Sequence, residues 1–160
     1  MYFKASLDLA SKIITWSLTG FILVYSFLLK DINPLILLPI LIILPILIFT
    51  YLYQPLGYEI TIDYIEIHRR VNKFYIPRNE IESVMVLHHN ELGRTWRTMG
   101  NGGLFGYTGY YNSSKFGNMR WFLSRRDNAV LIRMKNEKKY LISPDDAKGF
   151  VEAQQQDYFG

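Results

Sequence analysis

Apolar and charged positions divide the chain into two unlike parts. The first third holds two long runs without a charged side chain, residues 13–29 and 32–58. A helix that spans a membrane needs about 20 consecutive apolar residues. The two runs therefore predict two membrane-spanning helices, at about residues 13–30 and 34–53.

The two predicted helices form a transmembrane hairpin over residues 1–56. Asn33 and Pro34 are a turn signal at its tip. Pro39 and Pro45 each remove a backbone hydrogen-bond donor, so both are expected to kink the second helix. A cleaved signal peptide is the alternative for the first run, but that run is long and bulky and no small-residue cleavage site follows it.

Basic residues predict the orientation of the hairpin. The short loop between the helices carries one cation, Lys30. The outer flanks carry more cations, namely Lys4, Lys12, Arg69, Arg70 and Lys73. Because positive segments remain on the cytoplasmic side, both termini are expected in the cytoplasm, in an integral inner or plasma membrane protein with two spans.

Beyond the hairpin the solid apolar pattern changes to an alternating one. Apolar and polar side chains alternate, as in half-buried strands, at residues 58–62, 64–68, 73–76, 118–124, 129–134 and 139–142. Residues 79–87 fit one helical turn that leads into a further strand. Several short strands separated by polar turns predict a small antiparallel barrel or sandwich, in a cytoplasmic domain over residues 57–160.

One helix is predicted after the last strand. Ser143 offers an N-cap hydroxyl, and Pro144 suits the first helical position. Asp145 and Asp146 add negative charge where the helix dipole favours it. The modest apolar stripe that follows would close one end of the barrel.

Composition and the histidines narrow the chemistry. The chain has a net charge of +4 and no cysteine, which excludes disulfides and cysteine-ligated metal. His88 and His89 are adjacent and point to opposite faces of a strand, and His68 has no partner at a recognised spacing, so no metal site is predicted. A nucleophile with a neighbouring base is not evident either, so neither an enzyme nor a cofactor is expected.

A glycine-rich block interrupts the strand pattern. Five glycines fall within ten residues, with bulky aromatic side chains between them: Gly100, Gly102, Gly103, Gly106 and Gly109. Three interpretations remain open: an ordered hairpin packed under its own aromatics, aromatic side chains that dip into the bilayer interface, or backbone amides that cradle an anion. The block lacks the Lys-Ser/Thr ending of a nucleotide-phosphate loop.

Cations and aromatic residues surround the glycine block. They are the candidate contacts to a lipid or protein partner: Arg94, Arg97, Phe105, Tyr107, Tyr110, Lys115 and Arg120. Beside a membrane the nearest anionic partner is a lipid headgroup, to which each surface cation adds about 1 kcal/mol of attraction. A solvated cytoplasmic face is the alternative. No nucleic-acid readout motif is present in the sequence, so nucleic acid is not expected as a partner.

Four motifs occur together in the second part of the chain. They are Tyr58-Glu59-Ile60, Ile76-Pro77 before Glu80-Ile81, the glycine block, and residues 140–146 before Phe150-Val151. In this combination they resemble membrane-anchored bacterial proteins with a pleckstrin-homology-like (PH-like) domain. The resemblance implies a bent antiparallel barrel of about seven strands capped by a C-terminal helix. It also implies a binding or scaffolding module without enzyme activity.

Two functions follow from these features. In the first, the chain is a non-enzymatic module, anchored by its hairpin, that binds a protein partner or anionic lipid headgroups at the cytoplasmic face. In the second, the hairpin is the working part of an accessory or assembly subunit of a transporter or channel complex, or of a homo-oligomer. Charge inside a span usually marks a transport pathway. Residues 13–29 and 32–53 carry none, which favours the first function.

Overall fold

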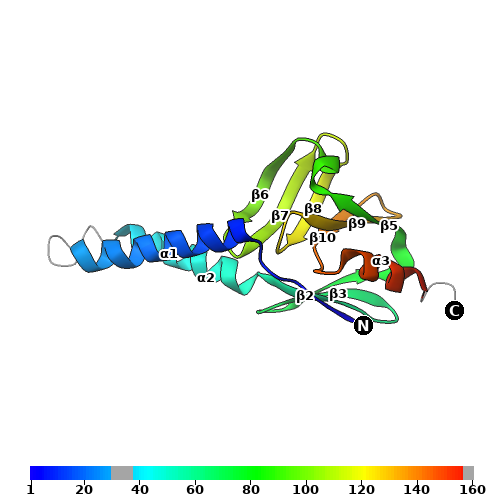
Figure 1. Cartoon of the computed structure of the whole chain (residues 1–160), viewed down its shortest axis with the longest axis horizontal. Helices are drawn as coiled ribbons and strands as arrows, with labels where there is room; N and C mark the ends of the chain where they lie inside the picture. Colours follow the sequence, from blue (N-terminus) through cyan, green and yellow to red (C-terminus); the bar gives the residue numbers. More distant parts are fainter. Residues whose placement is uncertain (30–37, 157–160) are drawn as a thin grey trace.

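The structure, a computed structural model, describes residues 1–29 and 38–156. Figure 1 shows two N-terminal helices that project from the same side of a mainly-β body, and a further helix on that body near the C-terminus. The helices are α1 (Leu9–Leu29), α2 (Leu38–Leu52) and α3 (Ala147–Gln156). Two short 3-10 turns, η2 (Arg78–Glu80) and η3 (His89–Leu92), flank the first strand of the second sheet.

The described residues form ten strands in two sheets. The first sheet has the order β1-β2-β3-β4 and consists of β1 (Tyr2–Lys4), β2 (Pro55–Ile60), β3 (Tyr64–Arg69) and β4 (Lys73–Pro77). The second has the order β5-β9-β10-β8-β7-β6 and consists of β5 (Ile81–His88), β6 (Thr95–Gly103), β7 (Gly106–Ser113), β8 (Gly117–Leu123), β9 (Asn128–Met134) and β10 (Lys139–Ile142). All neighbouring pairs are antiparallel except β10 and β8, which run parallel.

The predicted barrel of seven antiparallel strands is wrong in strand number and in one pairing. The mainly-β class and the terminal helix are confirmed. The additional strands are β1, which is only three residues long, and β6 and β7, which the glycine block forms. The parallel pair arises because β10 folds back along β9 and then lies between β9 and β8. The alternation of apolar and polar residues locates a strand, but it does not show which other strand will pair with it in the sheet.

Strand β1 ties the segment before the helices to the sheet. Tyr2, Phe3 and Lys4 pair with Glu59, Tyr58 and Gly57 of β2. The division predicted at residue 56 therefore does not separate helices from sheet, since the chain contributes a strand on each side of α1 and α2. Both ends of the helical segment are fastened to the same sheet.

Helix α1 begins four residues before the predicted start because Asp8 caps it. The Oδ1 atom of Asp8 accepts the backbone N–H of Ser11 at 2.7 Å, which satisfies a donor of the first turn. Residues 9–28 form the one helix of the described chain that is long and apolar enough to cross a membrane, by length and composition. Most of its apolar side chains are exposed. The helix therefore suggests an anchor.

Helix α2 is apolar but has only 15 residues, so the described part of the chain does not support a second span. Pro39 is the second described residue of α2, and the kink predicted there stays a prediction, because residue 35 lies outside the described residues. Pro45 lies inside the helix. The turn predicted at Asn33 and Pro34 lies outside the described residues.

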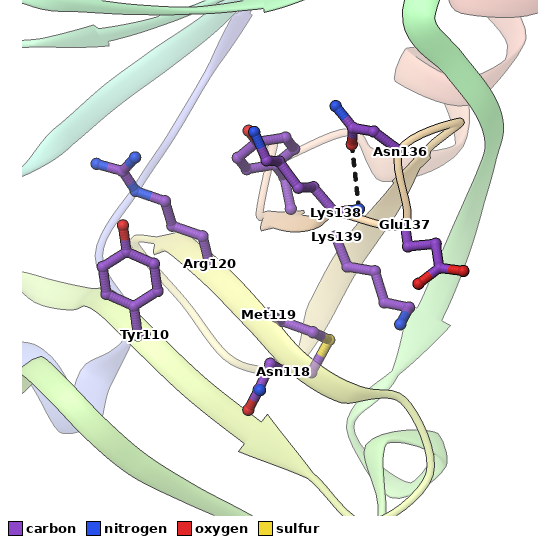
Figure 2. Close-up of a pocket in the computed structure, with 9 residues that line it drawn as sticks. Tyr110, Asn118, Met119, Arg120, Asn136, Glu137, Lys138 and Lys139 are labelled. Carbon is purple, nitrogen blue, oxygen red and sulfur yellow. Dashed lines mark hydrogen bonds between the residues drawn. The ribbon is translucent and has the colours of Figure 1, made fainter.

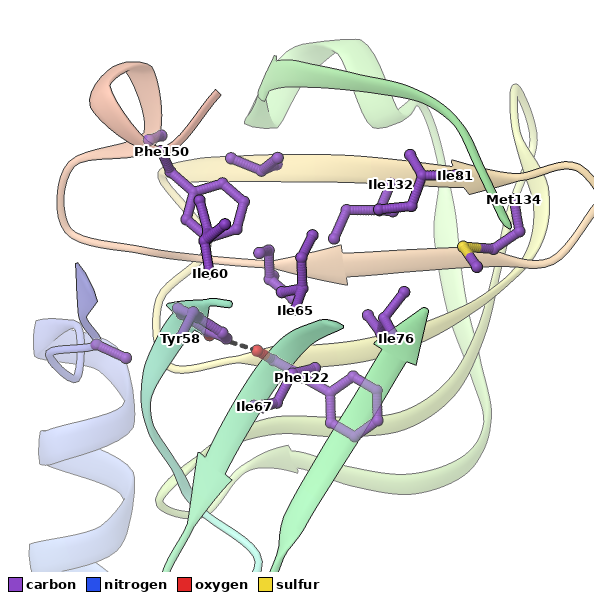
Figure 3. Packing of buried hydrophobic residues seen from close by; sticks show 14 residues of the cluster. Tyr58, Ile60, Ile65, Ile67, Ile76, Ile81, Phe122, Ile132, Met134 and Phe150 are labelled. Atoms are coloured by element: carbon purple, nitrogen blue, oxygen red, sulfur yellow. Dashed lines mark hydrogen bonds between the residues drawn. The ribbon is translucent and has the colours of Figure 1, made fainter. Parts of the chain in front are cut away.

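The main core lies between the two sheets. Figure 3 shows isoleucines of the first sheet, such as Ile65 and Ile67, gathered with Phe122 and Ile132 of the second. Phe150 of α3 belongs to the same cluster and is fully buried. The apolar stripe of the terminal helix therefore seals this core, as the sequence predicts.

A buried tyrosine joins the two sheets across this core. The hydroxyl of Tyr58 donates to the carbonyl of Phe122 at 2.6 Å (Figure 3). It also accepts the backbone N–H of Ser143 at 3.1 Å. Burial raises the pKa of Tyr58 to about 12. The phenol therefore stays neutral and holds two strands of the second sheet to β2.

A second cluster covers the opposite face of the six-stranded sheet. Trp121 precedes Phe122 by one residue in β8, so its side chain points to the opposite face of the sheet. Its ring stacks on that of Tyr111, with centroids 3.9 Å apart and planes 7° from parallel. Tyr107, Leu131 and other buried side chains complete this cluster. The sheet is thus packed on both faces.

Ser143 does not cap α3, contrary to the prediction. Its hydroxyl is buried and accepts the backbone N–H of Ser124 at 2.8 Å. The helix starts later, at Ala147, and Asp146 caps it: Oδ1 accepts the N–H of Gly149 at 2.9 Å. Ser143 directly follows β10, and its hydroxyl bonds to the backbone that follows β8. Asp146 caps the helix in its place.

Replacing Asp146 with alanine is expected to lower the free energy of unfolding by about 1 kcal/mol, because the N–H of Gly149 loses its acceptor. The thermal midpoint of the full chain in detergent should fall by about 2–4 °C. Asp146→Ser keeps an acceptor and should retain most of the stability. Equal midpoints for wild type and Asp146→Ala would show that the carboxylate does not act as the cap.

Candidate functional site

The glycine block forms a hairpin, here called the glycine hairpin, from β6 and β7. Leu104 and Phe105 make the turn between the strands. Asn101 fastens this turn, since its Oδ1 accepts the N–H of Leu104 at 3.2 Å and its Nδ2 donates to the carbonyl of Gly106 at 3.1 Å. The backbone of the block is therefore that of an ordered hairpin.

Gly100 and Gly109 lie opposite each other in the glycine hairpin, with φ of 124° and 132°. A Cβ atom on Gly109 would lie 2.2 Å from the carbonyl oxygen of Met99. One on Gly100 would lie 2.2 Å from that of Thr108. Because these contacts are to backbone, any side chain would force the strands apart. The pair leaves bare backbone in the middle of the hairpin.

The tip of the glycine hairpin rests on the two N-terminal helices. The backbone N–H of Phe105 donates to Oγ1 of Thr15 in α1 at 3.0 Å. The ring of Phe105 meets that of Tyr51 in α2 edge to face, with centroids 5.2 Å apart. The hairpin therefore forms a bridge between the sheet and the helical segment.

A groove of about 500 Å³ lies between α2 and the glycine hairpin. We call it the α2 groove. Its helical wall comes from side chains that recur at helical spacing along α2: Ile46, Phe49, Thr50 and Tyr53. Opposite them lie the glycine pair and the apolar side chains of Met99, Leu104 and Phe122. Much of the groove surface is therefore apolar.

Two arginines line the α2 groove without a carboxylate partner. Arg69 lies 5.9 Å from the ring centroid of Phe74 and 5.7 Å from that of Phe122. Arg120 lies 4.5 Å and 5.0 Å from the same two centroids. In the part of the chain that the structure describes, neither arginine forms an ion pair.

Electrostatics mark this arginine pair as a place for an anion. Burial lowers the pKa of Arg69, and the positive charge of Arg120 lowers it further. The Nε atom of Arg69 is buried and has no hydrogen-bond partner among the described residues. A phosphate or carboxylate between the two guanidinium groups would relieve their repulsion and accept their hydrogen bonds.

A second hollow, of about 380 Å³, adjoins the groove. Figure 2 shows Tyr110 and Arg120 on one side of it and Asn136 and Glu137 on the other. Tyr110 and Arg120 also line the α2 groove. We call this hollow the polar pocket, because Asn118 and two lysines contribute to its lining.

The structure brings five of the residues singled out in the sequence to the α2 groove. They are Gly100 and Gly109 of the glycine block and the candidate contacts Arg97, Tyr110 and Arg120. Arg97 adds a third cation to the groove and, unlike the half-buried Arg69 and Arg120, it is exposed.

The other candidate contacts lie elsewhere. Tyr107 is buried in the second core cluster, and Phe105 packs on the helices. Arg94 and Lys115 are exposed near the end of the glycine hairpin opposite its tip, where Thr95 pairs with Ser113. The proposed contact surface is therefore smaller than the full set of residues singled out in the sequence.

Sequence reasoning missed Arg69 and the face of α2. Arg69 entered the sequence argument only as a cation that sets orientation, because its place beside Arg120 depends on two strands of different sheets. The sequence did contain one indication that this face of α2 contributes to the groove. Ile46, Phe49 and Thr50 of α2 and Tyr53, the first residue after Leu52, recur at helical spacing in the sequence.

His68 lies close to two carboxylates on the outer face of the first sheet. Its Nε2 atom is 2.9 Å from Oε2 of Glu59 and 3.5 Å from Oε2 of Glu66. Within the described residues this is the one group of three potential metal ligands. Lys73 already pairs with Glu66 at 2.7 Å, so one of the two carboxylates has a cation of the protein itself as its partner. The sequence prediction of no metal at His68 rested on spacing and overlooked this cross-strand neighbourhood.

Comparison with known proteins gives one match. A family model described as bacterial PH domain matches residues 56–157, which is more than half of the chain. No curated protein and no solved structure matches the chain. The matched segment runs from β2 through α3 and contains the glycine hairpin and the arginine pair.

Proposed function

The chain belongs to the bacterial PH domain family, and from that premise we propose that it is a membrane-anchored module that binds an anionic phospholipid at the cytoplasmic face. PH-like domains are typically non-catalytic modules that bind proteins or lipids. We propose a lipid and not a protein as the ligand because of the α2 groove. Its apolar wall belongs to a helix that lies next to α1, the suggested anchor.

The observation that carries the proposal is the arginine pair. Arg69 and Arg120 share two aromatic rings and have no ion-pair partner among the described residues. Guanidinium groups bind phosphate through parallel hydrogen bonds, and they tolerate partial burial against aromatic rings. A phospholipid supplies the missing anion together with an apolar chain for the α2 side of the groove.

The arrangement of β1 and β2 supports anchoring by a helical hairpin. Both strands lie in one sheet, so the chain before α1 and the chain after α2 are on the same side of any membrane that the helices enter. A crossing by α1 then requires a return crossing before β2. The excess of cations on the outer flanks supports a cytoplasmic location for this side, and we propose that orientation.

The test compares two double variants of the full chain in detergent, titrated with phosphatidylglycerol and followed by native mass spectrometry. Arg69→Gln with Arg120→Gln should reduce the population of lipid-bound protein at least about tenfold, because charge-assisted hydrogen bonds to the phosphate are lost. Arg94→Gln with Lys115→Gln removes the same charge from exposed sites outside the groove and should leave binding nearly unchanged.

Two outcomes would contradict the proposal. An equal loss in both variants would show attraction to general surface charge, and equal retention would show that the groove holds no phospholipid. Circular dichroism on each variant separates loss of binding from loss of fold. Retention by both variants would instead favour a protein partner for this module.

A further inference from the structure

The α2 groove and the polar pocket lie on one face of the second sheet and share a boundary. Arg120 pairs with Tyr110 across β7 and β8, and with Tyr140 across β8 and β10. Along β8, Phe122 lines the groove on one side of this row and Asn118 lines the polar pocket on the other. Residues two apart on a strand share a face and lie about 7 Å apart. One ligand can therefore reach both spaces across Arg120.

Both spaces expose apolar surface, and the α2 groove is the more apolar of the two. On the α2 side, Ile46, Phe49 and Leu104 offer apolar surface. On the other side, Asn118 and Asn136 offer amide groups (Figure 2). An amphiphile with its phosphate at the arginine pair would therefore direct its chain toward α2 and its headgroup into the polar pocket. The reverse orientation would place an acyl chain among amides and charges, which is unfavourable.

Charge in the polar pocket discriminates among headgroups. Arg120, Lys138 and Lys139 face one carboxylate, that of Glu137, so three positive charges oppose one negative charge. A headgroup that carries an ammonium group would meet net repulsion there. A headgroup of hydroxyl groups could accept hydrogen bonds from the lysines and amides.

We infer that the α2 groove and the polar pocket together hold one phospholipid, and that the polar pocket selects a polyhydroxyl headgroup over one that carries an ammonium group. The phosphate lies between Arg69 and Arg120, one acyl chain lies along α2, and the headgroup lies beside Lys138 and Lys139. The inference rests on the proposed lipid binding and adds the class of lipid. Lys138 and Lys139 determine which headgroup is preferred, whereas the arginine pair binds the phosphate that all phospholipids share.

The experiment measures competition between phosphatidylglycerol and phosphatidylethanolamine with identical acyl chains. Phosphatidylethanolamine carries an ammonium group and no carboxylate, so its headgroup offers nothing that the lysines attract. The two lipids differ by one net charge, and a control variant that loses the same charge outside the pocket accounts for general surface attraction. The full chain in detergent receives equal amounts of both, and native mass spectrometry reports the two lipid-bound populations. We expect phosphatidylglycerol to exceed phosphatidylethanolamine about fivefold.

Two double variants separate selectivity from general charge. Lys138→Gln with Lys139→Gln should bring the ratio of the two lipids close to one and should retain binding of phosphatidylglycerol. Lys115→Gln with Lys148→Gln removes two exposed lysines that do not line the pocket and should keep the wild-type ratio. A ratio near one in the wild type, or the same ratio in both variants, overturns the selectivity. In either case the arginine variants still decide separately whether the groove binds lipid.

A soluble probe tests the part played by the acyl chain. Glycerophosphoglycerol has the phosphate and headgroup of phosphatidylglycerol but no acyl chains. If the chain lies along α2, this probe should need at least about a hundredfold higher concentration than the lipid to occupy the site, since burying apolar chain area contributes most of the affinity. Displacement of the lipid at equal concentration would overturn the placement along α2 and would leave a free phosphodiester as the ligand.

Discussion

Gly109→Ala is expected to lower the free energy of unfolding by at least about 3 kcal/mol, since it combines a strained backbone with a backbone clash. Gly109 has a φ of 132°, and a Cβ atom there would lie 2.2 Å from the carbonyl oxygen of Met99. The strands of the glycine hairpin would have to separate at its centre. The thermal midpoint of the full chain in detergent, followed by tryptophan fluorescence, should fall by about 10 °C or more.

A second glycine of the same strand pair supplies the control. Gly102 is not in the left-handed region, and its nearest neighbour is the flexible end of the Arg97 side chain. Gly102→Ala should therefore change the midpoint by no more than a few degrees. Similar losses at Gly102 and Gly109 would mean that the hairpin needs glycine for general flexibility, not for the close approach of its strands.

Tyr107→Ser is expected to cost about 3 to 5 kcal/mol of stability, in the range found when a buried aromatic side chain is deleted. The side chain of Tyr107 is only 6% exposed and packs in the cluster that contains Trp121. Thermal unfolding and the near-ultraviolet circular dichroism of the neighbouring tryptophan should both report the loss.

Tyr110→Ser is the matched comparison, three residues further along the same strand. Tyr110 is 51% exposed and lines both the α2 groove and the polar pocket. Its removal should leave the midpoint within a few degrees of wild type and should weaken the retention of phosphatidylglycerol. If Tyr110→Ser destabilised the chain as much as Tyr107→Ser, the residue would be part of the core and not of the ligand surface.

Apolar and β-branched residues bounded by polar turns locate several strands well, whether one face or both faces of the strand are buried. The bounds predicted for β3, β4, β9 and β10 agree with the structure to within one residue. The helical turn and strand predicted over residues 79–87 correspond to η2 and β5. By contrast, β6 is exposed on both faces for most of its length, so no alternation can mark it.

The candidate site was predictable only where it is local in sequence. Arg97 and Tyr110 lie within or beside the glycine block, and proximity in sequence was enough to group them. Arg69 belongs to another sheet and reaches Arg120 only through the packing of β3 against β8 side chains. The wrong prediction of Ser143 as a helix cap has the same cause. Its hydroxyl accepts a hydrogen bond from the backbone N–H of Ser124, which lies 19 positions earlier in the sequence.

The position of β1 also has a consequence for the order of assembly. Phe3 pairs with Tyr58, so this strand is synthesised before both helices and its partner after them. At about 5–20 residues per second, the ribosome adds the partner some seconds later. If the helices enter a membrane, as we propose, they have time to do so before the first sheet can close at its outer strand. Closure then locks the helical segment in place, since neither end can move without breaking a strand pairing.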